Sequence, residues 1–281
     1  GLDMNHMEFR TRPNTTVLNE QQVELTSDEY HGTIVASTAA APIDNLGAVG
    51  VYPQAALQAF DLWFLSESLI VQGISRATAA RAGVINLSLG GDEPSRAMYE
   101  AIVNAFGRGS IVVAAAGNDR LREDPPIYPA DFPHVLTVGS TDVRDRPSAF
   151  SSSSPAVDLA APGEQIPWQH PTDPATYQTV NGTSFSAPQV AAATARFWTA
   201  HVNVGGVVSP VAAPITGAAA RGTSATLASA TAESSKVACT LASGPSSTFR
   251  IWVSSSRTSV EPARSRGSPL TTSSQLAASS A

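Results

Sequence analysis

The sequence predicts an α/β protein with a three-layer αβα architecture, in which helices cover both faces of a doubly wound, mainly parallel sheet. Short β-branched or apolar runs at residues 56–62, 83–89, 110–116 and 134–139 are candidate strands. Helical patterns between them are typical of parallel strands joined by crossover helices. The 281 residues, 42% of them hydrophobic, are enough to bury a sizeable core.

Apolar residues at helical spacing predict the helices that cover the sheet. The first two stripes are Ile70, Ile74 and Ala77, and then Met98, Ala101, Ile102 and Ala105. The stripe of a later helix is Ala187, Val190, Ala191, Phe197 and Trp198, with Thr194 as a polar interruption. Pro188 is expected in the first turn of that helix, where a missing N–H costs nothing.

The chain divides near residue 202 into two parts of unlike composition. Residues 1–202 carry a net charge of −10, whereas residues 203–281 carry +4 and are mostly Ala, Ser, Thr, Gly and Pro without helical or strand periodicity. We therefore predict one domain over 1–202 and a low-complexity tail over 203–281. The tail is either a disordered linker or the product of a shifted reading frame in a GC-rich gene.

Composition also excludes several classes of partner. The net charge of −6 provides no basic patch for nucleic acid, and no apolar run reaches the roughly 18 residues that a membrane-spanning helix needs. The only cysteine, Cys239, cannot form an internal disulfide. The first residues lack an initiator methionine and a signal-peptide pattern, so we expect a mature form or a fragment.

Three side chains at predicted element ends could carry chemistry. Ser184 opens the late helix, where the field of a helix N-terminus suits a nucleophile as well as a simple N-cap. His31, before a glycine, is a candidate base or a packed histidine. Asn118 follows a strand and could donate a hydrogen bond to an oxyanion or serve as a turn residue.

Seven segments together resemble the subtilisin-like serine peptidases, or subtilases, from Gly1 to about Ala200. In chain order they read G-L-D-M-N-H-M-E-F, H-G-T, V-I-N-L-S-L-G-G, A-A-A-G-N, V-L-T-V-G-S-T-D, A-A-P-G and N-G-T-S-F-S-A-P. The last of these is the most specific, since a serine at a helix start within G-T-S-x-[SA]-x-P is rarely found outside this family.

The resemblance implies acyl transfer, with Ser184 as nucleophile, His31 as general base and Asn118 as side-chain oxyanion donor. It also implies that Ser88, Leu89 and Gly90 bind an extended protein or peptide substrate as an added strand. By the same similarity, Ala115, Ala116 and Gly117 form a wall of the primary specificity pocket, where their small size leaves room for a side chain. A propeptide and secretion are expected from the family alone.

The sequence departs from the family pattern at the triad aspartate. In the family motif D-[ST]-G the glycine corresponds to Gly1 and the aspartate precedes it by two residues, so the strand that carries the aspartate is expected to be missing and its neighbours to lack a partner. Two carboxylates are considered as substitutes that could orient His31. Asp3 aligns with an acidic neighbour of the motif and not with the triad member, and Asp28 reads as a solvated loop carboxylate more than as a substitute partner. Ile34 and Ser37 replace a second histidine and a small glycine of the family, and the added bulk of Ser37 is expected to loosen His31.

No cofactor is required for this chemistry, and calcium is an open alternative as a structural ion. Glu8 and the loop 42–48, including Asp44, offer a few oxygen ligands, although the same residues also read as a surface turn. The metal ligands and the oligomeric state are left unassigned. Asp119, Glu123 and Asp124 either favour basic peptides or are solvated loop charges.

The sequence therefore predicts a serine endopeptidase that acts through an acyl-enzyme. Two alternatives remain open at this stage. One is a catalytically impaired subtilase-fold module that binds extended peptides through residues 88–90, and the other is a fragment of a damaged gene. A missing aspartate would make activity very low.

Overall fold

The computed structural model describes residues 1–21, 30–171, 173, 176–202 and 250–255. The elements in chain order are β1 (Thr15–Val17), α1 (His31–Ala40), β2 (Ala56–Asp61), α2 (Glu67–Ala79), β3 (Val84–Ser88), α3 (Arg96–Gly107), β4 (Ile111–Ala115), β5 (Val135–Thr141), β6 (Val157–Pro162), β7 (Ile166–Gln169), β8 (Tyr177–Val180), α4 (Thr183–Val202) and β9 (Arg250–Ser255). The four predicted strands correspond to β2, β3, β4 and β5, with ends that differ by no more than two residues.

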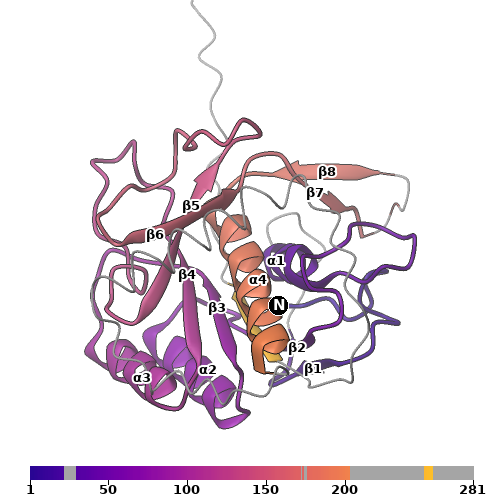
Figure 1. The fold of residues 1–281 in the computed structure, drawn as a ribbon, viewed down its shortest axis with the longest axis horizontal. Coiled ribbons are helices and arrows are strands. Elements are labelled where there is room, and N and C mark those ends of the chain that lie inside the picture. Colours follow the sequence, from indigo (N-terminus) through magenta and orange to yellow (C-terminus); the bar gives the residue numbers. More distant parts are fainter. Residues whose placement is uncertain (22–29, 172, 174–175, 203–249, 256–281) are drawn as a thin grey trace, which may run out of the picture.

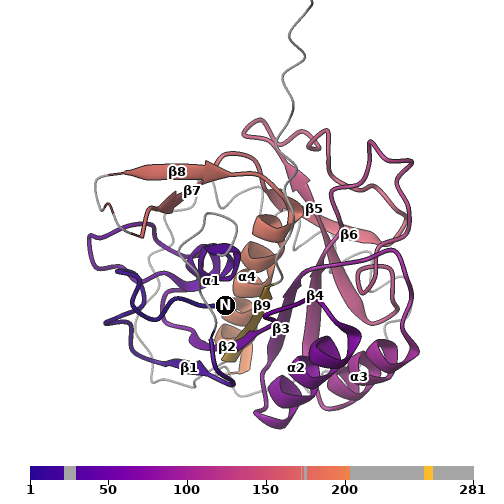
Figure 2. The ribbon, with the colours of Figure 1, turned by 180° about the vertical axis from the view of Figure 1, so that it is seen from behind.

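The main sheet has seven strands in the order β1-β2-β9-β3-β4-β5-β6, and every neighbouring pair in it is parallel. Strands β7 and β8 form a separate antiparallel pair. Helices α1 and α4 cover one face of the main sheet, while α2 and α3 lie together on the other (Figures 1 and 2). This arrangement confirms the predicted three-layer α/β fold.

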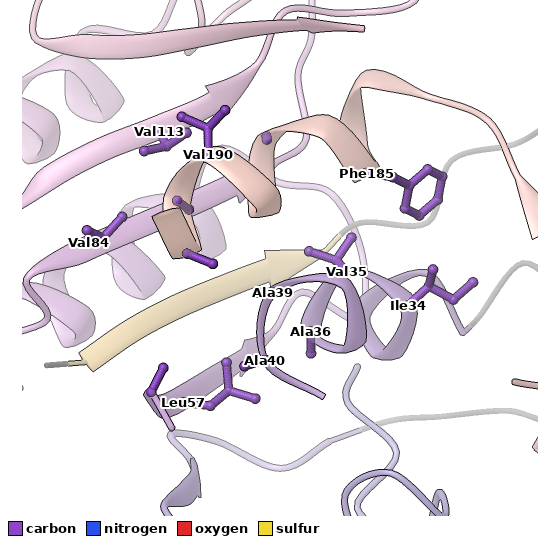
Figure 3. Close-up of a cluster of buried hydrophobic side chains, with 14 of the residues drawn as sticks. Ile34, Val35, Ala36, Ala39, Ala40, Leu57, Val84, Val113, Phe185 and Val190 are labelled. Atoms are coloured by element: carbon purple, nitrogen blue, oxygen red, sulfur yellow. The ribbon is translucent and has the colours of Figure 1, made fainter. Parts of the chain in front are cut away.

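Two hydrophobic clusters fill the spaces on either side of the sheet. Successive strand residues point to opposite faces, so Val113 joins the cluster under α1 and α4 whereas Val112 and Ala114 join the cluster under α2 and α3. Figure 3 shows part of the first cluster, with Val35 of α1 and Val190 of α4 among its labelled side chains. Each face of the sheet is therefore buried, as its nearly continuous apolar strands require.

Serine side chains fix where the helices α2 and α3 begin. Ser66 Oγ accepts a hydrogen bond from Leu69 N at 3.3 Å, and Ser95 Oγ accepts one from Met98 N at 3.0 Å. These N-caps satisfy backbone donors that have no partner within the helix. The predicted stripes of both helices are buried, apart from the partly buried Ala101.

The stripe of α4 agrees with the prediction in its first half only. Ala187, Val190 and Ala191 are buried, as is Thr194, but Phe197 is 52% exposed. At 100° per residue, Phe197 lies roughly 70° from the centre of the stripe, which places it at the edge of the face that meets the sheet. Its predicted contact with the sheet is therefore wrong, and Trp198 is only partly buried.

The tail contributes a central strand to the sheet. Within 203–281 the structure describes only Arg250–Ser255, and these residues form β9, which pairs along Ala56–Asp61 of β2 and Val84–Ser88 of β3. The expected absence of a strand in the tail is therefore wrong at this segment, and β2 and β3 do not lack a partner. The rest of the predicted low-complexity tail, including Cys239, lies outside the described residues.

Within the described part of the chain, no helix has both the length and the apolar character needed to cross a membrane.

Candidate active site

The three residues singled out for chemistry come from different elements that meet at one edge of the sheet. Parallel strands place their carboxyl ends together, and a ligand crevice lies beyond them. Asn118 follows β4, and Ser184 lies in the first turn of α4, which packs across β3, β4 and β5. His31 is the first residue of α1, and its ring centroid lies 5.5 Å from the ring of Phe185, the residue after Ser184.

Ser184 lies inside α4 and does not act as its N-cap. The helix begins at Thr183, and no described backbone N–H donates a hydrogen bond to Ser184 Oγ. The early position of Ser184 in the helix keeps its own N–H among the donors that have no partner within α4. That N–H and the Oγ are therefore both at the positive end of the helix.

Pro188 lies in the second turn of α4, and the predicted first-turn position is wrong. A proline inside a helix leaves the carbonyl four residues earlier without its donor, and here that carbonyl belongs to Ser184. Ser88 Oγ supplies the missing bond by donating to Ser184 O at 2.7 Å. Ser88 also accepts a bond from Asn86 Nδ2 at 3.0 Å, so a buried network ties the end of β3 to the first turn of α4.

Asn118 is oriented by the start of α4. Its Oδ1 accepts hydrogen bonds from Thr183 N and Thr183 Oγ1, both at 3.0 Å. Because a backbone N–H can only donate, this contact fixes which end of the amide is the oxygen. No described residue accepts a bond from Nδ2, which lies 3.5 Å from the position a Cβ would take at Gly182. The amide N–H group is thus available to a ligand beside Ser184.

His31 is buried, and its ring has no polar partner within the described part of the chain. Its side chain is 8% exposed, and neither Nδ1 nor Nε2 makes a hydrogen bond to a described residue. Burial, and to a smaller extent the positive charge of the N-terminal amine, lowers the pKa of His31 to about 4. The imidazole is therefore neutral at pH 7 and able to accept a proton.

The carboxylates considered as orienting partners of His31 are engaged elsewhere or lie outside the described chain. Asp3 Oδ1 accepts from Asn5 N at 2.8 Å, while Asp3 N donates to Thr33 Oγ1 at 2.9 Å. Asp28 is not among the described residues. A further buried carboxylate, Asp61 at the end of β2, forms an ion pair of 3.0 Å with the amine of Gly1. Its position at the end of a predicted strand is the one feature of the sequence that points to Asp61, and the sequence analysis did not single it out.

A cavity of about 260 Å³ lies between the ends of β3 and β4 and the start of α4. Among the predicted substrate-binding residues, Leu89, Gly90, Ala115 and Gly117 line it together with Asn118 and Ser184. Ser88 and Ala116 are buried and are not part of its lining. Ile127, which sequence reasoning did not single out, also lines the cavity.

The three acidic residues predicted near this cavity have different surroundings. Asp119 lines the cavity and pairs with Arg122 Nη1 at 3.0 Å. Asp124 accepts from Ser153 Oγ at 2.6 Å, and this bond is the main cause of the lowered pKa of its carboxyl. Glu123 is exposed and does not line the cavity. Two of the three are thus outside the cavity, in keeping with loop charges.

The carboxylate of Glu8 is satisfied by protein donors. Ser37 Oγ donates to Glu8 Oε2, and Ala48 N donates to Oε1 at 2.7 Å. Asp44 Oδ1 accepts from Leu46 N at 3.0 Å. The described residues contain no group of three or more His, Cys, Asp or Glu side chains able to hold a metal ion. The calcium site considered above therefore stays a prediction, and we derive no role for the ion.

Ser37 ties α1 to the N-terminal segment through Glu8. The hydroxyl that replaces a family glycine is 3% exposed and has a hydrogen-bond partner, and Ile34 is buried at 3% exposure in the hydrophobic cluster of Figure 3. The predicted loosening of α1 by the bulk of Ser37 therefore has no support in the packing of the helix.

Comparison with known proteins finds relatives that share the sequence and the fold of this chain. A sequence model described as the subtilase family matches residues 2–249. Subtilisin DY of Bacillus licheniformis is 34% identical over 201 residues, which cover 69% of this chain and 72% of that protein. Thermitase of Thermoactinomyces vulgaris is 40% identical over 166 residues, covering 57% of this chain and 58% of thermitase.

Other relatives are matched over a smaller share of their length. Subtilisin amylosacchariticus of Bacillus subtilis subsp. amylosacchariticus is 33% identical over 207 residues, which are 72% of this chain but 54% of that protein. The chain thus spans about half the length of this relative.

A solved structure is also similar in fold. The S218A mutant of the protease domain of PatA superposes with a TM-score of 0.66 at 27% identity, covering 74% of this chain and 80% of that one.

Proposed function

Because the chain belongs to the subtilase family, we propose that it is a serine endopeptidase whose catalytic residues are Ser184, His31 and Asn118. The observation that supports this assignment best is the orientation of Asn118. Its oxygen is held by Thr183, and its N–H group is left beside the first turn of the helix that carries Ser184. A donor fixed in this way before substrate binds is what stabilisation of a developing oxyanion requires.

The proposed reaction proceeds through an acyl-enzyme. Neutral His31 takes the proton of Ser184 as Oγ forms a bond to the peptide carbonyl carbon, and the negative charge moves to the carbonyl oxygen. Asn118 Nδ2 and the N–H of Ser184 donate to that oxygen. The C–N bond then breaks as His31 gives its proton to the leaving amine, and water releases the acyl group by the same steps.

The substrate is proposed to bind as an extended strand beside Leu89 and Gly90. Both residues line the cavity that also contains Ser184. Gly91, the next residue, is already paired with Tyr128 through bonds of 2.9 and 2.7 Å between their backbone groups. This bridge holds the segment after β3 in place, so the backbone of 89–90 is preorganised for main-chain hydrogen bonds to a peptide.

A fluorophosphonate probe tests the proposal on the full chain. We expect covalent labelling of Ser184, detected by mass spectrometry of the modified peptide, and its loss in Ser184→Ala. The exposed Ser68 provides a matched control, because Ser68→Ala should leave the labelling unchanged. A folded wild-type protein that is not labelled would exclude the peptidase assignment.

One observation favours a second candidate function, a module that binds peptides without cleaving them efficiently. No described carboxylate accepts a hydrogen bond from His31, since both ring nitrogens are without a partner. Loss of the triad aspartate lowers kcat about 3 × 10⁴-fold in a subtilisin. Binding of an uncleaved peptide by a folded, unlabelled chain would support this module. Secretion and a propeptide stay predictions.

A further inference from the structure

Ile127 occupies the space between the two glycines that flank the proposed specificity pocket. A Cβ placed on Gly90 would lie 2.5 Å from Ile127 Cγ2, and one placed on Gly117 would lie 2.7 Å from Ile127 Cγ1. Distances this short mean that the branched side chain fills the room that both glycines leave open. Gly117 also has a φ of +103°, so it serves the turn as well as the pocket.

Hydrogen bonds made by its backbone hold Ile127 in position. Ile127 N donates to Asp131 Oδ2 at 2.8 Å, and Ile127 O accepts from Asp131 N at 2.8 Å. The next residue, Tyr128, is bridged to Gly91 through two backbone bonds. Ile127 is 5% exposed, so displacing it would require breaking these bonds or moving neighbouring buried atoms.

We infer that Ile127 restricts the pocket to small side chains, so that the enzyme prefers an alanine-sized residue on the acyl side of the scissile bond. This inference rests on the proposed function, because it places the substrate side chain between residues 89–91 and 115–117. A large aromatic ring entering there would overlap with the γ-carbons of Ile127. The small wall residues Ala115 and Gly117 therefore do not by themselves make a large pocket.

Two peptidyl diphenyl phosphonates that differ only in the side chain beside phosphorus, methyl or benzyl, test the inference. Ser184 Oγ forms a bond to phosphorus as phenol leaves with the serine proton, so the labelling rate reports access to the pocket without turnover. We expect the wild type to react faster with the methyl probe. In Ile127→Gly the benzyl-to-methyl rate ratio should rise about tenfold or more.

Two further variants keep the test decisive. Ile127→Val should shift the ratio in the same direction by a smaller factor, and it preserves the fold if Ile127→Gly does not. Val143→Ala changes an apolar residue that is 77% exposed and does not line the cavity, and its ratio should equal that of the wild type.

The outcomes separate the inference from the proposed function. A wild type that reacts with a small fluorophosphonate but prefers the benzyl probe overturns the role of Ile127 alone. The role of Ile127 is also overturned if fluorophosphonate labelling is intact in Ile127→Gly and Ile127→Val but neither variant changes the benzyl-to-methyl rate ratio. A wild type that reacts with none of the probes overturns the proposed function instead.

Discussion

His31 is buried and no described residue forms a hydrogen bond with its ring, and this determines how the residue responds to pH. Protonation would place a positive charge among apolar neighbours such as Phe185, and the nearby N-terminal amine adds repulsion. Both effects favour the neutral ring. A general base must be neutral before it can accept a proton, so the surroundings of His31 keep it competent well below the pH at which an exposed histidine is half protonated.

We predict that His31 makes the free energy of unfolding depend on pH between about 6.5 and 4. Its pKa is about 4 in the folded chain and near 6.5 when unfolded. In this range only the unfolded state binds the proton, so stability is complete above pH 6.5 and falls by roughly 3 kcal/mol as pH decreases to 4. Urea denaturation across this range, compared with His31→Gln, isolates the effect. Identical pH slopes in both proteins would contradict the prediction.

Ser88 donates a hydrogen bond to the carbonyl oxygen of Ser184, which lacks its helical N–H donor because residue 188 is a proline. We predict that Ser88→Ala lowers stability by about 1–3 kcal/mol, since Ser184 O and Asn86 Nδ2 each lose a buried partner. It should also slow fluorophosphonate labelling, because the first turn of α4 is held less firmly. Denaturation and labelling rates measure the two effects.

A matched serine separates positioning from stability. Ser110 is 3% exposed and donates to Ala82 O at 2.7 Å, the same distance as the Ser88 bond. Ser110→Ala should lower stability without changing the labelling rate at Ser184. Equal slowing in both variants would mean that Ser88 acts through stability alone.

At the scale of elements, the sequence predicts well those segments whose burial is periodic or continuous. Strands β2, β3, β4 and β5 are apolar runs, and α2 and α3 have regular stripes, so local pattern and tertiary packing agree. In contrast, β8 is mostly exposed and β1 has only three residues, which leaves little apolar signal to detect. The short run Ile251–Val253 was the only apolar signal for β9, and its partners lie far away in the chain.

The sequence predicts those residues of the candidate site that lie within the motifs shared with the family. His31, Asn118 and Ser184 follow from the segments around them, and the structure places all three at the carboxyl edge of the sheet. Ile127 was not predictable, because its effect depends on contacts with two glycines from other segments. Likewise, the link between Pro188 and Ser88 arises only when β3 packs against α4.

Arg12 connects α1 to the segment before β2, and no described carboxylate pairs with it. Its Nε donates to Ala40 O at 2.7 Å, and its Nη2 donates to Pro53 O at 3.0 Å and Ala55 O at 2.6 Å. Burial lowers the pKa of this guanidinium to about 10, yet it stays charged at neutral pH. The rigid fork of arginine lets one side chain satisfy carbonyls from two segments.

We predict that Arg12→Lys destabilises the fold by about 3 kcal/mol or more, because an ammonium cannot reach all of these carbonyls and each buried group left unpaired costs about 1–3 kcal/mol. Chemical denaturation measures the change. The control is Arg108→Lys, since Arg108 is exposed and, among the described residues, its side chain bonds Asn104 Oδ1 alone. Its effect should stay within about 0.5 kcal/mol. Equal stabilities of the two variants would contradict the proposed link.

For the molecule as a whole, β9 joins two halves that carry different parts of the candidate site. On one side lie β1, β2 and the neighbouring α1, which begins with His31, and on the other lie β3 to β6 with Asn118. Strand β9 pairs with both halves, and α1 and α4 each contact it from the same face. The relative position of His31 and Ser184 therefore depends on a strand from the far end of the chain.

This topology predicts that a proline in β9 disturbs both neighbouring strands and the site at once. A central strand uses every backbone N–H for its ladders, so Val253→Pro removes one bond and strains the pairing with Ala59 and Asn86. Hydrogen exchange should show faster amide exchange in β2 and β3 together, and fluorophosphonate labelling of Ser184 should slow. Val143→Pro, at a position that is 77% exposed in the turn Asp142–Asp145 outside β9, should do neither. If exchange in β2 and β3 matches the wild type in Val253→Pro, then β9 does not hold the two halves together, and His31 and Ser184 must be aligned by the packing of α1 against α4 alone.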